Sequence, residues 1–231
     1  AETGKTFFQG LLFLLMLAIL LCLLSKIFSP VLLKHLITSD DVYNAVIRYL
    51  DWRIWGLLFS FPFLALRSFL VGITQTKSLN MAAFTAVLVN IPLNWLLIFG
   101  FDMGISGAAI ASSSAEMCSL AVLAAYMFRH IDKKVYGLYW RIDITILKEV
   151  FSISVWSMLQ FFTSVAIWFL FFVAIERLGE TELAVSNIVR SVSALFSVIV
   201  NALAGVTGSL VSNLIGAGEK KKVFPLCHKI I

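Results

Sequence analysis

Long apolar segments alternate with short polar ones along the whole chain, and this pattern predicts a helical membrane protein. An α-helix needs about 20 mostly apolar residues to cross the hydrocarbon core of a bilayer. Six segments reach that length, at residues 7–33, 54–73, 81–100, 104–128, 150–175 and 183–215, and a polar, helix-periodic lead-in from Val42 precedes the second. The predicted fold class is therefore all-α, polytopic, with six transmembrane helices and both ends on one side of the membrane.

The composition supports an integral membrane protein. Hydrophobic residues make up 60% of the 231 residues and charged residues 13%, whereas about 25% of the residues of a soluble domain are charged. The net charge of +5 would suggest a nucleic-acid partner in a soluble chain. In a membrane protein it reports orientation, so we expect no nucleic acid. Three scattered cysteines and the absence of paired metal-ligand or phosphate-loop motifs predict no metal and no cofactor.

The basic residues of the connections predict that both ends lie in the cytoplasm, because Lys and Arg are enriched in cytoplasmic loops. Four regions carry most of them, namely Lys5, Lys77, Arg129, Lys133, Lys134, Arg141, Lys148, Lys220, Lys221, Lys222 and Lys229. The opposite side has little beyond Lys34 and Arg177, even when Arg48 and Arg53 are added. The longest loop, 129–148, is basic and aromatic, so we expect it to contact anionic membrane lipids.

The hairpin over residues 81–116 carries a pattern that is specific to a family. An Asn-rich helix closes on Leu-Ile-Phe-Gly at 97–100, and Gly-Ile-Ser-Gly-Ala-Ala-Ile-Ala at 104–111 opens the next helix. Tyr49-Leu50 and the run 67–72 precede it, and Leu183-Ala184 and Leu-Ile-Gly-Ala-Gly at 214–218 follow. In order and spacing these motifs resemble the multidrug and toxic compound extrusion (MATE) transporters over nearly the whole chain.

The resemblance implies a twelve-helix bundle of two lobes, of which this chain carries six helices, starting at the third. Residues 1–130 would be four N-lobe helices, 131–149 a cytoplasmic inter-lobe loop, and 150–231 the start of the C-lobe with two helices and the beginning of a third. The remaining helices of a longer chain would then be its neighbours. By resemblance, the protein is a secondary transporter of the bacterial inner membrane. It would export organic cations, drugs or other amphipathic xenobiotics by alternating access, in exchange for H⁺ or Na⁺.

Glu116 is the first candidate for a functional side chain. A charge at the centre of a membrane helix costs about 2.5–3.5 kcal/mol on insertion scales, so such residues usually have a role. Glu116 follows Gly107, Ala111 and Ala115, a row of small residues four apart that permits close helix contact. Two roles remain open for Glu116: binding of a cation or proton, or an ion pair, for which Arg67 is the suggested partner.

Two polar stripes form the second group of candidates. The last long helix presents Asn187, Arg190, Ala194, Ser197, Asn201, Ala204, Gly208 and Ser212 on one face, and the helix before it presents Ser157, Gln160, Ser164 and Trp168. Steps of three and four keep each set on a single face. The stripes either pack helices together or line a substrate cavity. Gln160, Ser164, Arg190 and Asn201 are the predicted path residues.

Asn90 and Asn94 share a face of the third predicted helix around Pro92. Proline frees a carbonyl one turn earlier, which a nearby Asn can satisfy, so these residues either repair the helix or line a cavity. Many bacterial members of the family carry a carboxylate midway along the helix matching 150–175. Here Gln160, Thr163 and Ser164 occupy that position, so the resemblance transfers no acidic coupling group there.

Three other functions fit the sequence less well. Gly-Ile-Ser-Gly at 104–107 matches a short intramembrane-protease pattern, but that reaction needs a His base on a neighbouring membrane helix. His35, His130 and His228 all lie near helix ends or in loops, so the chain is not expected to be an enzyme. The alternative is a flippase of lipid-linked oligosaccharides, whose pyrophosphate would require several basic residues, whereas the stripes contain only Arg190. A non-transporting scaffold would not need Glu116 and Arg190.

Overall fold

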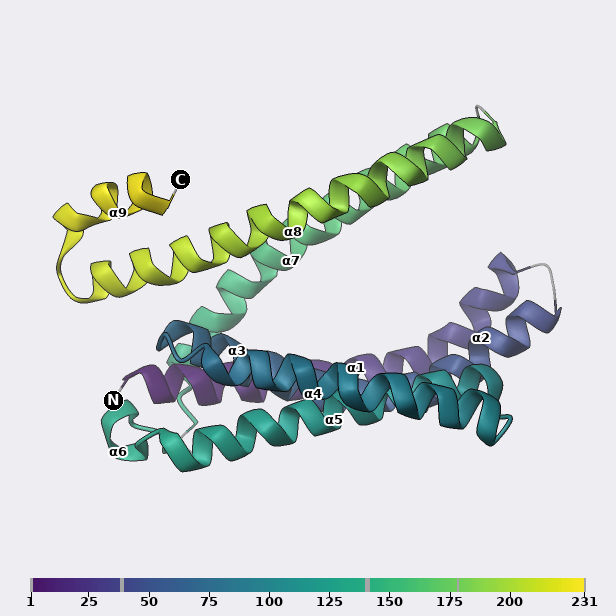
Figure 1. Cartoon of the computed structure of the whole chain (residues 1–231). Helices are drawn as coiled ribbons and strands as arrows, with labels where there is room; N and C mark the ends of the chain where they lie inside the picture. Colours follow the sequence, from purple (N-terminus) through teal and green to yellow (C-terminus); the bar gives the residue numbers. More distant parts are fainter. Residues whose placement is uncertain (1, 38–39, 140–141, 178, 231) are drawn as a thin grey trace. The chain divides into compact units, whose positions relative to one another are not determined.

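The computed structural model describes residues 2–37, 40–139, 142–177 and 179–230. Its elements, in chain order, are helices (Figure 1): α1 (Glu2–Leu36), α2 (Asp40–Arg53), α3 (Leu57–Gly72), α4 (Lys77–Trp95), α5 (Gly104–His130), α6 (Lys133–Tyr136), α7 (Ile144–Glu176), α8 (Glu180–Gly216) and α9 (Val223–Ile230). Short 3₁₀ turns η1 (Ile54–Gly56) and η3 (Lys220–Lys222) and a π-helical turn η2 (Leu96–Gly100) join some of them. Arg141, used above for orientation, lies outside the described residues.

Six segments are long and apolar enough to cross a membrane: Thr3–His35, Asp40–Gly72, Lys77–Gly100, Gly104–His130, Ile144–Ile175 and Thr181–Gly216. The predicted all-α fold with six membrane helices is confirmed, and the chain is a multi-pass membrane protein. The helices extend beyond the apolar cores at most ends, since a helix continues into the polar interface once its backbone is formed. The polar lead-in is α2, which runs through η1 into α3 as part of one span.

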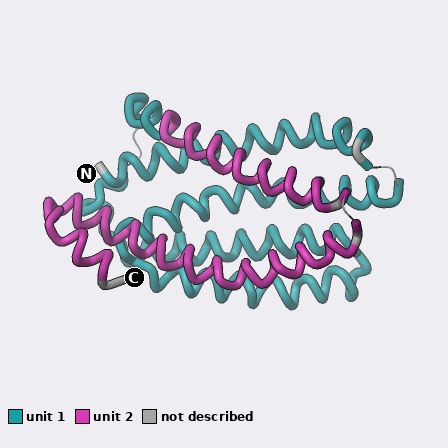
Figure 2. Tube along the Cα trace, turned by 90° about the horizontal axis from the view of Figure 1, so that it is seen from above, with its two compact units in different colours: residues 1–150 teal, residues 151–231 magenta. Residues whose placement is uncertain are grey.

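The chain divides into two compact units, residues 1–150 (unit 1) and 151–231 (unit 2), which Figure 2 distinguishes by colour. Helix α7 begins in unit 1 and continues in unit 2. Each unit is described by itself below.

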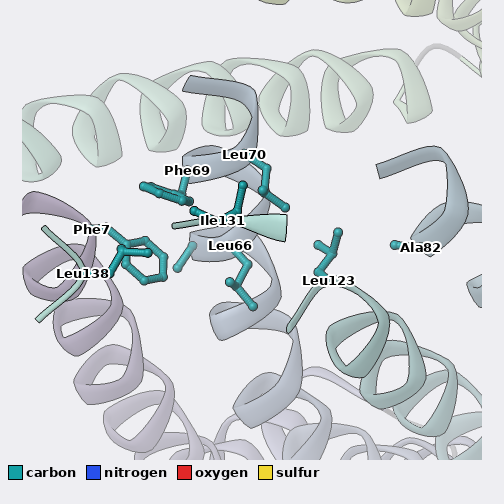
Figure 3. Packing of buried hydrophobic residues seen from close by; sticks show 9 residues of the cluster. Phe7, Leu66, Phe69, Leu70, Ala82, Leu123, Ile131 and Leu138 are labelled. Atoms are coloured by element: carbon teal, nitrogen blue, oxygen red, sulfur yellow. The ribbon is translucent and has the colours of Figure 1, made fainter. Parts of the chain in front are cut away.

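Unit 1 is built on contacts of α1 with α3, and of α2, α3 and α4 with α5. Its core gathers Phe7, Ala65, Leu66, Phe69, Leu70, Ala82, Leu123, Ile131 and Leu138 (Figure 3). The rings of Phe7 and Phe69 lie 4.8 Å apart between centroids, so α1 and α3 are joined through aromatic packing. Ile131 and Leu138 come from the connection after α5, which therefore packs back onto the helix ends.

The row of small residues on α5 does bring helices together, as the sequence predicted. Gly107, Ala111 and Ala115 are all buried. A Cβ atom at Gly107 would lie 2.9 Å from the carbonyl carbon of Leu97 in η2, closer than real Cβ atoms approach backbone. The turn before α5 is tight, with φ of 52° at Asp102 and 53° at Gly104, a left-handed conformation that glycine tolerates best.

Unit 2 has a more open construction. Helices α7 and α8 meet at the turn around Gly179 and diverge from it (Figure 2). Large apolar side chains on both are mostly exposed, for example Phe162 at 71% and Leu195 at 70%. Such surfaces suit contact with lipid tails or with further apolar helices, because every backbone polar group is already satisfied within the helix.

Candidate functional site

Glu116 lies at the centre of a polar cluster between α2, α3 and α5. Arg53, the last residue of α2, donates from Nη1 to Oε2 at 2.9 Å and from Nη2 to Oε1 at 2.6 Å. Ser60 of α3 donates its hydroxyl to Oε2 at 2.5 Å. A bidentate guanidinium–carboxylate pair is among the strongest polar contacts in proteins, and each charged side chain remains 29% exposed.

Glycine makes room for this cluster. A Cβ atom at Gly56 in η1 would lie 2.7 Å from Ser113 Oγ and 3.1 Å from Glu116 Oε2, and would also collide with Arg53 Nη1. The sharp change from α2 through η1 into α3 therefore places Arg53 and Ser60 on the same carboxylate. Any larger residue at position 56 would push the guanidinium away.

The suggested partner of Glu116, Arg67, is wrong. Arg67 is exposed on α3 and follows Ser60, which does contact Glu116, by seven residues. That spacing is about 10 Å along a helix. The sequence analysis counted Arg53 only among the basic residues of the non-cytoplasmic side, and it missed Arg53 as the partner of Glu116 because the contact joins residues 63 apart. The available signal was that an intramembrane carboxylate needs a partner of opposite charge.

A cavity of about 390 Å³ adjoins Glu116 within unit 1. Its lining comes from α3, α4 and α5: Phe63, Ala82, Ala83, Ala86, Val87, Asn90, Ile91, Ser112, Ala115, Glu116 and Ser119. The structure thus brings Glu116 and Asn90 to the walls of one cavity. One carboxylate, one amide and two hydroxyls on apolar walls can hold a small polar or cationic group, although both carboxylate oxygens already accept hydrogen bonds.

Asn90 and Asn94 form a linked pair on α4. Asn94 donates its side-chain amide to both the backbone carbonyl and Oδ1 of Asn90, each at 2.9 Å. Asn90 donates in turn to Ser112 Oγ on α5 at 3.5 Å. The carbonyl that Pro92 frees belongs to Leu88, four residues earlier. Asn94 donates to the carbonyl of Asn90 and not to that of Leu88, so it does not satisfy the carbonyl that the proline frees. Asn94 instead orients Asn90, which reaches the cavity, while Asn94 is not among its lining residues.

A second cavity of about 490 Å³ lies within unit 2 between α7 and α8. It is lined by Trp168, Phe171, Phe172, Val185, Ser186, Val189, Arg190, Ser193, Ala194, Ser197, Val198 and Asn201. The Arg190 guanidinium lies 5.1 Å from the centroid of the Phe172 ring. Its Nη2 also donates a long hydrogen bond of 3.5 Å to Asn187 Oδ1.

Apart from Asn94, the candidate residues predicted from the sequence separate into three groups. Glu116 and Asn90 line the unit 1 cavity, whereas Arg190 and Asn201 line the unit 2 cavity. Gln160 and Ser164 are exposed on α7 outside both linings, because the helices diverge and only the aromatic end of that stripe faces α8. Within the described ranges, no three His, Cys, Asp or Glu side chains gather as metal ligands.

Comparison with known proteins shows what the chain resembles. Residues 2–96 match the MatE family model. A probable multidrug resistance protein NorM of Shewanella oneidensis is 29% identical over 176 residues, covering 72% of this chain and 38% of the relative. The chain is therefore similar to the MatE family, and the match to the family model covers its first two fifths.

Other MatE relatives extend the match across kingdoms. Multidrug resistance protein MdtK of Pectobacterium atrosepticum is 24% identical over 188 residues, covering 78% of this chain and 41% of the relative. Protein DETOXIFICATION 8 of Arabidopsis thaliana is 27% identical over 209 residues, covering 84% and 41%. The chain spans about two fifths of the length of each of these three relatives.

Proposed function

We propose that this chain is part of a secondary transporter that exports organic cations, drugs or other amphipathic xenobiotics. The observation that carries the proposal is the MatE match, joined to relatives that are named multidrug resistance proteins. Six segments long and apolar enough to cross a membrane, and two cavities with mixed apolar and hydrogen-bonding walls, also support the proposal. We place the protein in a bacterial inner membrane with both ends of the chain cytoplasmic.

Transport would proceed by alternating access and be coupled to inward H⁺ or Na⁺. Coupling requires that the ion and the substrate bind the two states with different affinities. Glu116 is the proposed coupling carboxylate in this chain. The Arg53 guanidinium competes with the transported cation for this carboxylate. An external cation gains the carboxylate only in a state where the Arg53 guanidinium has moved away. Asn90 supplies a neutral oxygen ligand on the same cavity wall.

The test is ethidium efflux from drug-sensitive cells that express the complete transporter polypeptide. Wild type is compared with Glu116→Gln while an H⁺ gradient or a Na⁺ gradient is imposed separately. Glu182→Gln is the matched control, because Glu182 is an exposed acid in the first turn of α8. We expect gradient-driven efflux in wild type and in the control, and its loss in Glu116→Gln at equal membrane abundance.

Two results would contradict parts of the proposal. Normal export by Glu116→Gln would exclude Glu116 as the coupling group. No export by wild type with either gradient, despite correct insertion, would exclude drug efflux. The flippase alternative has weaker support, since Arg190 is the one basic side chain in the linings of the two cavities described above, too few for a pyrophosphate.

A further inference from the structure

The unit 2 cavity carries a positive charge that its own walls do not neutralise. Arg190 is the one charged side chain among the described residues that line it. In the part of the chain that the structure describes, the salt bridges join other residues, and Arg190 contacts the neutral Asn187 at 3.5 Å. A guanidinium has five N–H donors in a planar fork that matches a carboxylate or sulfonate, and most of those donors remain available here.

The aromatic walls of this cavity disfavour a cationic ligand. The Arg190 guanidinium already covers the face of Phe172 at 5.1 Å from the ring centroid. A bound cation at that face would meet a like charge within a few ångströms, and the repulsion between the two charges opposes its binding. The rings of Trp168 and Phe171 stand edge to face, with their centroids 5.8 Å apart. They therefore offer a ring surface to a flat ligand rather than a cage for an ammonium group.

Hydrogen-bonding groups continue from Arg190 along one face of α8. Ser193, Ser197 and Asn201 also line the cavity, at steps that keep them close to one face of a helix. Ser197 donates to the backbone carbonyl of Ser193 at 2.9 Å, which leaves its oxygen able to accept. These neutral groups tolerate varied polar substituents, while the single cation selects the sign of the ligand.

We propose that the unit 2 cavity binds an aromatic anion, with its carboxylate or sulfonate on Arg190 and its ring against Trp168 and Phe171. This inference rests on the proposed transport function and narrows it. One class of exported compound is anionic or zwitterionic aromatics, recognised at a site distinct from the acidic cavity of unit 1. Selectivity between the two charge classes then depends on two separate side chains, Arg190 and Glu116.

A matched pair of probes tests the charge preference directly. 1-Pyrenesulfonate and 1-pyrenylmethylammonium share a ring system and differ in the sign of their charge. Binding to the complete transporter in lipid nanodiscs is measured by energy transfer from tryptophan to pyrene, and transport is measured separately in proteoliposomes. The variants are Arg190→Gln, Arg190→Lys and, as control, Arg177→Gln, which removes an exposed charge near the turn of the same unit.

We expect Arg190→Gln to weaken sulfonate binding by about tenfold to a hundredfold, the range for loss of a charged hydrogen-bonding partner. Binding of the ammonium probe should be unchanged or tighter, Arg190→Lys should retain part of the sulfonate affinity, and Arg177→Gln should behave as wild type. If Arg190→Gln fails to insert, Arg190→Lys together with Trp168→Leu decides the question, because Trp168→Leu should weaken both probes through the shared ring.

Equal effects of Arg190→Gln on both probes, or wild-type binding that ignores the sign of the charge, would overturn the inference. These outcomes differ from failure of the transport proposal. Sulfonate binding that depends on Arg190, without gradient-driven movement of any probe, would refute transport and leave the binding site intact. Ethidium export without charge-selective pyrene binding would do the reverse.

Discussion

Units 1 and 2 each hold a charged side chain within an apolar helix, but only the charge in unit 1 has a counter-ion among the described residues. Glu116 is met by a bidentate guanidinium and a hydroxyl from two other helices. Arg190 meets an aromatic face and one distant amide oxygen. The difference teaches that an intramembrane charge is not by itself a sign of a ligand site. A satisfied pair first of all holds helices together, whereas a charge without a counter-ion on its cavity wall is available for recognition.

Packing follows the same division. Leu70 is fully buried in the unit 1 core, while Leu195 in unit 2 is 70% exposed. Gly107 leaves no space for a Cβ atom, whereas nothing lies within 4 Å of one at Gly208. Three mutational comparisons below test the contrast, in order of decreasing expected effect on stability.

The largest effect is expected from the Arg53–Glu116 pair. Removing one partner of a buried pair typically costs about 3–5 kcal/mol because the other charge is left alone. Since each side chain here is 29% exposed, we expect roughly 2 kcal/mol for either Arg53→Gln or Glu116→Gln. The double variant should lose less than the sum of the two. Unfolding by a denaturing detergent, analysed as a double-mutant cycle, measures this coupling.

Arg190→Gln is the matched control for that cycle. Because Arg190 pairs with no carboxylate in the described part of the chain, its loss should change the unfolding free energy by less than about 0.5 kcal/mol. Additive effects of Arg53→Gln and Glu116→Gln, or a loss for Arg190→Gln as large as theirs, would abolish the distinction between the two charges.

Glycine substitutions test packing without altering charge. Gly107→Val places new atoms against the backbone of Leu97, where a Cβ would stand 2.9 Å from the carbonyl carbon, so we expect a loss of about 1–2 kcal/mol from overpacking. Gly208→Ala enters open space within α8 and should stabilise that helix by about 0.5–1 kcal/mol. Detergent-induced unfolding of both variants is the measurement, and effects of equal sign would contradict the description.

The smallest effect is expected at Ser60. Ser60→Ala removes the hydroxyl that donates to Glu116 at 2.5 Å, which should cost about 1 kcal/mol and leave the ion pair in place. Ser197→Ala removes a hydroxyl that bonds only one turn back on its own helix, and it should be nearly neutral. Equal apparent melting temperatures for the two variants in detergent would argue against Ser60 as a second partner of Glu116.

Several site residues were within reach of sequence reasoning, and others were not. Glu116, Asn90, Arg190 and Asn201 stand out because polar groups are rare in apolar helices, and all four line cavities. Arg53 and Ser60 did not stand out. Arg53 ends a polar helix that looked interfacial, and a serine is common in membrane helices, so neither carries a local sign of its contact with α5.

Gln160 and Ser164 were predicted to line a cavity, and the structure does not place them in either of the two cavities described above. Their spacing on α7 matches that of a cavity-lining stripe, yet both are exposed outside the two linings. Periodicity tells which residues share a face of one helix, but it contains nothing about the angle at which the next helix leaves the turn. The divergence of α7 and α8 decides that only Trp168 and its neighbours reach Arg190.

The sequence by itself determined the class of the protein, the number of membrane helices and the position of each along the chain. These follow from local physics, since a backbone in lipid must satisfy its own hydrogen bonds and a helix needs a certain apolar length to cross. Only the tertiary structure decided that Glu116 pairs with Arg53, that Asn94 orients Asn90, and that Arg190 faces an aromatic wall. The contacts of Glu116 and Arg190 join residues on different helices, and their geometry depends on helix packing that no local pattern records. Asn94 and Asn90 lie only four residues apart, but Asn90 also donates to Ser112 on α5, so packing decides the direction of that amide as well.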